Sequence, residues 1–185
     1  LDVSRISRGK IELRTGRVEL GTLVERAVEL IRPLLDERGH RFTVDLPGEP
    51  VTLWGDAARL VQIVANLLQN AAKYTDRGGN ISLHAIQEGE ALRLAVRDDG
   101  VGLTEQMRER VFEPFVQAPR SRDRARGGLG VGLALVRGLV ALHGGSVLAL
   151  SDGPGRGSEF VVRLPLRSAA AEASAADIPG VEAPA

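Results

Sequence analysis

Residues 66–75 read Asn-Leu-Leu-Gln-Asn-Ala-Ala-Lys-Tyr-Thr, and they lie in the most regular apolar pattern of the chain. The pattern predicts a helix that begins after Asp56, a good N-cap residue, and buries one apolar face. At 100° per residue, Asn66, Asn70 and Lys73 fall within about 60° of one another beside that face. Amide oxygens coordinate Mg²⁺ and an ammonium group meets phosphate, so this stripe is a candidate ligand site; a solvated helix face is the alternative.

The segments on either side of this helix predict an α+β fold. Upstream, Thr22 to Glu25 has the form of a capping box, Pro33 predicts a bend, and Gly39 predicts the end of a helix. Downstream, an apolar run predicts a third helix over residues 131–142. Alternating segments predict strands over residues 41–46, 51–54, 81–86, 91–96, 146–150 and 159–164, whereas residues 100–130 show no sustained period. Helices and mostly antiparallel strands in this order predict a two-layer α/β sandwich, with a mixed sheet on about three helices.

The chain divides into one folded core and two flanking segments. Residues 1–16 have the pattern of a helix end followed by a linker, and residues 168–185 are rich in Ala and Pro. The latter cannot bury enough apolar surface to fold alone, so we expect a tail or linker there. The predicted domain is therefore residues 17–167.

Composition excludes several classes of protein. The 24 basic residues balance the 24 acidic ones, which argues against nucleic-acid binding and against attraction to an anionic membrane surface. The chain has no cysteine, so disulfide frameworks, thiolate zinc sites and cysteine nucleophiles are excluded. No apolar run reaches the length of a membrane span, which predicts a fragment that makes no membrane contact.

Two glycine-containing segments are further candidate sites. Residues 96–103 read Val-Arg-Asp-Asp-Gly-Val-Gly-Leu, in which Asp98 could accept a hydrogen bond from a ligand amine while the glycines admit the ligand; an ordinary acidic turn is the alternative. Residues 127–133 read Gly-Gly-Leu-Gly-Val-Gly-Leu immediately before the third helix, which suits phosphate at a helix N-terminus or, alternatively, a flexible loop. Neither a dinucleotide fingerprint nor a P-loop is present.

The order of the motifs resembles a known family. The Asn66 stripe, the Asp98 turn, Phe-Glu-Pro-Phe at residues 112–115 and the glycine run occur in the order of the N, G1, F and G2 boxes of bacterial sensor histidine kinases. The resemblance is to the catalytic and ATP-binding domain of that family and covers residues 18–165. It implies the sandwich fold of the gyrase, chaperone, kinase and mismatch-repair ATPases, with ATP held between helices under a mobile lid. We expect Phe112 and Phe115 to anchor the base of that lid, as buried core as much as by function, and the arginine-rich segment of residues 117–126 to be poorly ordered without nucleotide.

The resemblance also implies a role for individual residues. Asp98 would accept a hydrogen bond from the adenine amino group, and Asn70 would hold Mg²⁺ against the phosphates. Asn66, Asn70 and Lys73 would be catalytic. Asp99 stands where the family usually has Asn, and Leu129 stands where the family often has Thr. The implied nucleotide contacts are Asn66, Asn70, Lys73, Tyr74, Asp98, Gly100, Gly102, Phe115, Gly128, Gly130, Gly132 and Leu133.

Asn66 carries a mechanistic implication. The water-using ATPases of the superfamily have a glutamate base at this place, and an amide cannot accept a proton at neutral pH. The site is therefore suited to present the ATP γ-phosphoryl to another nucleophile, which is a histidine in this family. His40, His84 and His143 are not in a phosphoacceptor context, so we expect the acceptor upstream of Leu1.

The family also implies partners and location. We expect the dimerisation and phosphoacceptor helices of the same full-length protein, whose end residues 1–16 would form, and the receiver domain of a response regulator. The fragment would be monomeric and cytoplasmic in a bacterium, and the full-length protein would be a homodimer with or without a membrane anchor. The alternatives are a nucleotide-binding regulatory module without transfer activity, a self-contained ATPase, and an anti-sigma-type serine kinase.

Overall fold

The structure, a computed structural model, describes residues 12–116 and 130–166. The expected helix end in residues 1–11, the arginine-rich segment, Gly128 and the Ala/Pro tail lie outside the described residues.

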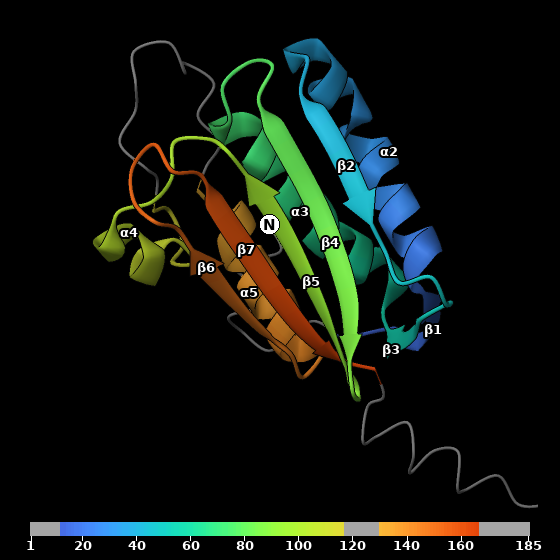
Figure 1. The fold of residues 1–185 in the computed structure, drawn as a ribbon. Coiled ribbons are helices and arrows are strands. Elements are labelled where there is room, and N and C mark those ends of the chain that lie inside the picture. Colours follow the sequence, from blue (N-terminus) through green and yellow to red (C-terminus); the bar gives the residue numbers. More distant parts are fainter. Residues whose placement is uncertain (1–11, 117–129, 167–185) are drawn as a thin grey trace, which may run out of the picture.

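A five-stranded sheet forms one layer, with the strand order β2-β4-β5-β7-β6 (Figure 1). Strand β2 pairs in parallel with β4, and the other three pairs are antiparallel. This confirms the predicted mixed, mostly antiparallel sheet. The strands are β2 (Arg41–Asp45), β4 (Asn80–Glu88), β5 (Ala91–Asp98), β6 (Ser146–Leu150) and β7 (Ser158–Pro165).

Three helices pack together on one face of the sheet and form the second layer (Figure 1). They are α2 (Leu20–Arg38), α3 (Ala57–Tyr74) and α5 (Gly132–Leu142). The predicted apolar face of α3 is buried, and the Asp56 carboxylate caps its first turn by accepting the Arg59 N–H at 3.1 Å. Gly39 ends α2 with φ of 64°, as expected of a left-handed cap. The predicted two-layer α+β sandwich is confirmed.

The capping box predicted at Thr22 is wrong. Helix α2 begins at Leu20, so Thr22 lies inside its first turn and donates to the Glu19 carboxylate at 2.7 Å. The Leu20 N–H donates to the Val51 carbonyl at 2.9 Å, and the Leu20 side chain is buried. Tertiary packing of Leu20 therefore starts the helix earlier than the local capping pattern indicates.

Three short elements complete the fold. Strand β1 (Gly16–Glu19) pairs antiparallel with β3 (Thr52–Gly55) in a separate two-stranded sheet. Helix α4 (Glu105–Arg110) lies in the segment where the sequence shows no sustained period, and Thr104 caps it. The sequence pattern predicted neither β1 nor α4.

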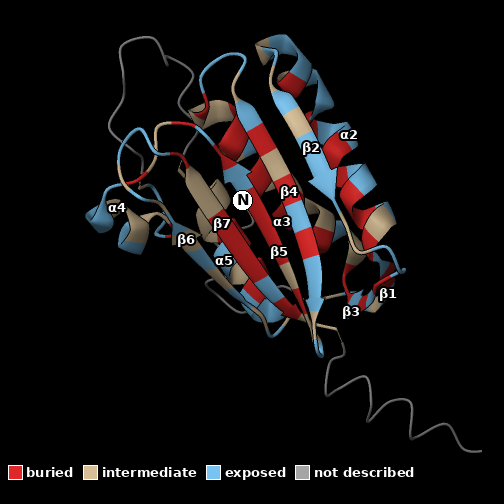
Figure 2. Ribbon diagram, in the orientation of Figure 1, coloured by how far each residue is buried: buried red, intermediate tan, exposed pale blue. Residues whose placement is uncertain are grey.

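The core lies between the two layers and is aliphatic. Figure 2 shows that burial is concentrated in the central strands, whereas β2 at the sheet edge is largely exposed. Phe160 on β7 is the largest fully buried side chain among the described residues. Among the described helices, none combines the length and the apolar character that crossing a membrane requires.

Candidate functional site

Asp98 is the buried carboxylate of the candidate site, and it lies at the end of β5. Its side chain is only 5% exposed. Oδ1 accepts the Gly100 N–H at 2.9 Å, and Oδ2 accepts the Ser158 hydroxyl at 2.6 Å. Burial raises the pKa of Asp98 above its usual value, although the hydrogen bonds from Ser158 and Gly100 oppose that shift. The two oxygens are thus held in one orientation by the chain itself.

Ser158 is a residue of this site that the sequence motifs did not reveal. It is the first residue of β7, and the ladder places it directly opposite Asp98. The pairing joins positions sixty residues apart, and no local pattern around Ser158 indicates it. Only the sheet register brings the hydroxyl to the carboxylate.

Gly100 and Gly102 are required by close backbone contacts. A Cβ atom on Gly100 would lie 2.3 Å from the Tyr74 carbonyl oxygen, and the Val101 N–H donates to that oxygen at 3.1 Å. Gly102 has φ of 66°, and its Cβ would lie 2.1 Å from the carbonyl oxygen of Gly153. The turn therefore packs between the C-terminal end of α3 and the loop before β7, with room for no larger residue.

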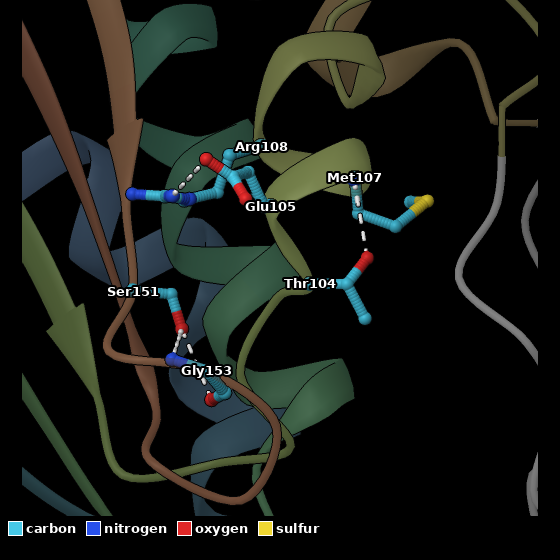
Figure 3. Close-up of polar contacts among 6 residues, drawn as sticks. All are labelled: Thr104, Glu105, Met107, Arg108, Ser151 and Gly153. Atoms are coloured by element: carbon cyan, nitrogen blue, oxygen red, sulfur yellow. Dashed lines mark hydrogen bonds and ion pairs between the residues drawn. The ribbon is translucent and has the colours of Figure 1, made fainter.

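Ser151 holds this glycine-rich loop in place. Its hydroxyl lies 2.7 Å from the Gly157 carbonyl, and it accepts the Leu103 N–H at 3.0 Å. Figure 3 shows the same hydroxyl against Gly153, near α4, where Thr104 accepts the Met107 N–H. The loop after β6 and the turn after Asp98 thus form one hydrogen-bonded unit.

Asp99 has a structural role beside Asp98. It accepts hydrogen bonds from the backbone N–H of Asn80, at 2.8 Å, and from the Asn80 side-chain amide. Partial burial would raise the pKa of Asp99, but the Asn80 hydrogen bonds and the nearby Arg41 lower it. The exposed Asp99 carboxylate therefore ties the turn to the start of β4.

The polar stripe of α3 faces the start of α5. Asn66 is half-buried, and its Oδ1 lies 3.7 Å from the position that a Cβ atom on Gly132 would take. The Asn66 Nδ2 atom is buried without a hydrogen-bond partner among the described residues. A buried amide donor without a partner costs free energy, so this atom is a place where a ligand acceptor would be favourable.

Asn70, Lys73 and Tyr74 lie further along α3, and all three are half-buried. The Lys73 ammonium lies 5.0 Å from the centroid of the Tyr74 ring, within cation–π distance. The Tyr74 carbonyl contacts the turn after Asp98, as described above. The stripe is therefore continuous with the Asp98 turn.

The glycine run meets the Phe-Glu-Pro-Phe motif by a backbone hydrogen bond. The Phe115 N–H donates to the Gly130 carbonyl at 2.9 Å, and both residues have positive φ, 66° and 70°. Gly132 is the first residue of α5, and Leu133 packs against the core. Among the described residues, no side chain caps the first turn of α5, and the N-terminal end of a helix is the kind of place that favours an anion.

The two phenylalanines of this motif behave differently. Phe112 is buried and makes an edge-to-face contact with Phe160, with ring centroids 6.1 Å apart. Phe115 is 75% exposed, so our expectation that both rings are buried at the base of the lid is wrong for Phe115. Its left-handed backbone, fixed by the Gly130 contact, turns the ring away from the core.

All three histidines of the chain lie in described segments and contact protein groups. His40 lies 3.0 Å from the Ala72 carbonyl, and His84 lies 3.1 Å from the Asp45 carboxylate. His143 is the C-cap residue of α5 and contacts the Leu139 carbonyl and the Asp56 N–H. Each histidine thus has a structural partner.

Comparisons of the sequence with a family model and with curated proteins both point to histidine kinases. Residues 55–168 match the family described as histidine kinase-, DNA gyrase B- and HSP90-like ATPases. An uncharacterized sensor-like histidine kinase of Rhizobium meliloti is 35% identical over 97% of this chain, and the histidine protein kinase DivJ of Caulobacter vibrioides is 37% identical over 90% of it. The chain spans 34% and 28% of their lengths, so it corresponds to about a third or less of these relatives.

Two solved structures are similar in fold and sequence. Full-length ShkA in complex with AMPPNP superposes with a TM-score of 0.77 and 33% identity, over 90% of this chain and 34% of that one. The mycobacterial sensor histidine kinase MprB has a TM-score of 0.71 and 29% identity, over 82% of this chain and 97% of that one.

Proposed function

This chain belongs to the family of histidine kinase-, DNA gyrase B- and HSP90-like ATPases and, within it, to the catalytic and ATP-binding domains of sensor histidine kinases; from this premise we propose that it transfers the γ-phosphoryl group of Mg·ATP to a histidine outside this chain. The observation that carries the proposal is the buried Asp98 carboxylate, oriented by Ser158 and Gly100.

Asp98 would recognise the base of the nucleotide by accepting a hydrogen bond from it. With Gly100 and Ser158 donating to it, each carboxylate oxygen retains a further lone pair, since a carboxylate offers about four acceptor positions. The exocyclic amine of adenine supplies the matching donor. We therefore assign Asp98 to adenine recognition, with Tyr74 packing on the nucleotide.

The phosphates would lie between α3 and the start of α5. Among the described residues no side chain caps the first turn of α5, and a Cβ atom on Gly132 would lie 3.7 Å from the Asn66 Oδ1 atom, so a phosphate at this helix start would lie close to Asn66. The Asn66 Nδ2 atom, which has no partner among the described residues, is a further donor for a phosphate oxygen. Lys73, which lies on the same stripe, supplies a positive charge.

The α3 stripe also fits a divalent cation. The amide oxygens of Asn66 and Asn70 are hard ligands of the kind that Mg²⁺ accepts together with phosphate oxygens and water. We assign Asn70 to the metal. A bound Mg²⁺ would neutralise charge on the phosphates.

Asn66 would make the site a transferase rather than a hydrolase. An amide does not accept a proton at neutral pH, so Asn66 cannot activate water as a general base. Its half-buried position against Gly132 instead suits it to hold the phosphates for a nucleophile from elsewhere. Each histidine of this chain already has a structural partner, so we place the acceptor on the dimerisation helices of the full-length protein.

The partners follow from this assignment. A response regulator would receive the phosphoryl group from that histidine, and the dimerisation helices would make the full-length protein a homodimer. ATP as the substrate places the domain in the bacterial cytoplasm. We assign residues 17–167 to the catalytic domain, residues 1–16 to the end of the dimerisation and phosphoacceptor helix with its linker, and residues 168–185 to a tail or linker.

The test is phosphotransfer in trans. The chain is incubated with γ-labelled ATP, Mg²⁺ and the dimerisation segment of its own full-length protein. We expect acid-labile, alkali-stable label on a histidine of that segment, and none when Asn70→Ala replaces the unmodified chain. Acid-stable label on Ser or Thr would indicate a serine kinase, and tight ATP binding without label would indicate a regulatory module; either result contradicts the proposal.

A further inference from the structure

His143 joins two helices of the candidate site at the end remote from the nucleotide. The ring Nε2 accepts the backbone N–H of Asp56 at 3.1 Å, and Nδ1 donates to the Leu139 carbonyl at 2.8 Å. One bond belongs to the last turn of α5 and the other to the N-cap of α3. The pattern requires the neutral ring with its proton on Nδ1, since Nε2 must be an acceptor.

The same two helices meet again at the candidate ligand site. Asn66 lies ten residues beyond Asp56 on α3, and Gly132 lies eleven residues before His143 on α5; these two residues face each other. At 1.5 Å per residue, both spans are about 15–16 Å, so the helices run antiparallel with matched lengths. The His143 junction and the Asn66–Gly132 contact are therefore the two ends of one antiparallel helix pair.

Packing between the two ends makes the pair rigid. Leu60, Ile63 and Val64 on α3 and Val136, Leu139 and Val140 on α5 are all buried. Helices α3 and α5 pack directly against each other, as Figure 1 shows beneath the sheet. A close-packed interior transmits displacement rather than absorbing it, so a shift at the junction reaches the ligand end.

Asp56 brings the chain that precedes the domain into the same junction. Its carboxylate accepts the Arg14 N–H at 2.9 Å as well as the Arg59 N–H. These hydrogen bonds, with the Arg59 charge, lower the pKa of Asp56 even though partial burial opposes the shift. Strand β1 then pairs with β3, which leads into Asp56. The residues just before β1 are thus tied to the start of α3.

We propose that His143 is a positioning residue for nucleotide binding. By accepting the Asp56 N–H, it joins the end of α5 to the start of α3 and so sets the distance between Asn66 and the first turn of α5. It also couples that distance to the segment that enters the domain at Arg14. The proposal rests on the assignment of the ATP site above. It concerns a contact remote from the nucleotide, so it can fail while that assignment stands.

Two variants separate the bonds of the imidazole. In His143→Gln, the side-chain oxygen reaches the Nε2 position and accepts from Asp56, while the bond to Leu139 is lost. In His143→Asn, the amide reaches only the Nδ1 position, so the bond to Leu139 is kept and the Asp56 N–H loses its acceptor. Both variants remove one hydrogen bond and the ring, so they are matched for a purely structural effect.

The measurement is ATP affinity with Mg²⁺, by calorimetry on the 185-residue chain, with thermal unfolding recorded in parallel. We expect His143→Asn to weaken binding about five- to tenfold and His143→Gln to change it less than about twofold. Equal affinities in the two variants, whether both unchanged or both weakened, would overturn the proposal. An unmodified chain that binds no ATP would instead overturn the proposed function.

Two further measurements keep the test decisive. If His143→Asn does not fold, Gly55→Ala is the alternative, because a Cβ there would lie 2.8 Å from the His143 Cδ2 atom and 2.9 Å from the Leu60 Cδ1 atom, so that both side chains must shift. A two- to fivefold loss of affinity is expected, and no loss would overturn the proposal. Trp54, the only tryptophan of the chain, lies on β3 beside this junction. ATP should change its emission in the unmodified chain, because coupling is reciprocal; unchanged emission at saturating ATP would contradict the coupling.

Discussion

The two ends of the candidate nucleotide site differ in how far the chain satisfies its own polar groups. At the adenine end, both oxygens of Asp98 accept hydrogen bonds, and Ser151 ties the neighbouring loop together. At the phosphate end, the Asn66 Nδ2 atom is buried without a partner among the described residues, and no described side chain caps the first turn of α5. Within the described part of the chain, the polar groups of one end are satisfied, whereas the other end contains donors without acceptors.

The difference matches what each end must recognise. A neutral base offers only a few directional hydrogen bonds, so the side chain that recognises it must already be held in the correct orientation before the base binds. Phosphates and a metal ion bring large charges, which can fill donor and acceptor positions left open by the protein. We infer that base recognition is built into the fold, whereas the phosphate end becomes complete when the nucleotide binds.

The largest effect is expected at the phosphate end. Asn70→Ala removes the proposed metal ligand, and we expect Mg²⁺-dependent ATP binding to weaken about a hundredfold, a difference of about 2.7 kcal/mol. Asn66→Ala, one turn earlier, should retain part of the binding. Calorimetry with and without Mg²⁺ measures both, and equal tolerance of the two changes would indicate a solvated helix face.

The next effect concerns the rigidity of the adenine end. Gly102→Ala places a Cβ 2.1 Å from the Gly153 carbonyl oxygen at positive φ, whereas Gly89→Ala has the same sign of φ and open space around it. We expect Gly102→Ala to lower the free energy of unfolding by about 2 kcal/mol more than Gly89→Ala. Denaturant unfolding tests this, and equal losses would show that the turn is not tightly packed.

Asp98→Asn should separate binding from stability. Charge-assisted hydrogen bonds contribute about 1.5–3 kcal/mol, so ATP affinity should fall about tenfold or more. The asparagine can still accept from Gly100 and donate to Ser158, so the fold should be retained. Unchanged affinity in calorimetry would remove Asp98 from the site.

The pH dependence of the same variant has a definite sign. Burial raises the pKa of Asp98 in the folded state. Folding therefore favours the protonated carboxyl of Asp98. Its contribution to stability is fully present below the unfolded-state pKa and is lost as pH rises through the raised folded-state pKa. At neutral pH, the melting temperature of Asp98→Asn should be at least as high as that of the unmodified chain. As pH falls towards 4, the melting temperature of the variant should fall relative to that of the unmodified chain. Thermal unfolding over this range measures the difference, and the opposite trend would contradict the burial argument.

The smallest effect is expected at Ser158. Ser158→Ala removes the hydroxyl that orients Asp98 but leaves the Gly100 N–H in place. We expect ATP affinity to fall only about threefold, because the lost hydrogen bond orients Asp98 but does not itself contact the nucleotide. Thr at this position is the matched control and should bind normally. A loss as large as that of Asp98→Asn would mean that Ser158 contacts the nucleotide itself.

Much of the fold could be predicted because its signals are local. The apolar period of α3, the cap at Asp56 and the left-handed Gly39 each depend on neighbouring residues, and all three were confirmed. Strand β1 and helix α4 were missed because β1 has four residues with one buried side chain, and α4 has six residues with none. Such short elements leave no apolar period to detect.

Parts of the site could not be predicted because they depend on pairing across the sheet or between helices. Ser158 reaches Asp98 only through the register of β5 and β7, and His143 reaches Asp56 only because α3 and α5 run antiparallel. Phe115 was expected in the core, but its contact with Gly130 determines its backbone. The roles of Asn66, Asn70 and Lys73 stay predictions.

The most direct test of the account is phosphate release from ATP by the chain alone. Asn66 cannot activate water, so the unmodified chain with Mg·ATP should release little phosphate while binding the nucleotide measurably by calorimetry. Asn66→Glu, which restores a carboxylate at this position, should release phosphate faster than the unmodified chain. Brisk release by the unmodified chain, unaffected by replacing Asn66, would contradict the claim that this site holds ATP for transfer to an outside acceptor.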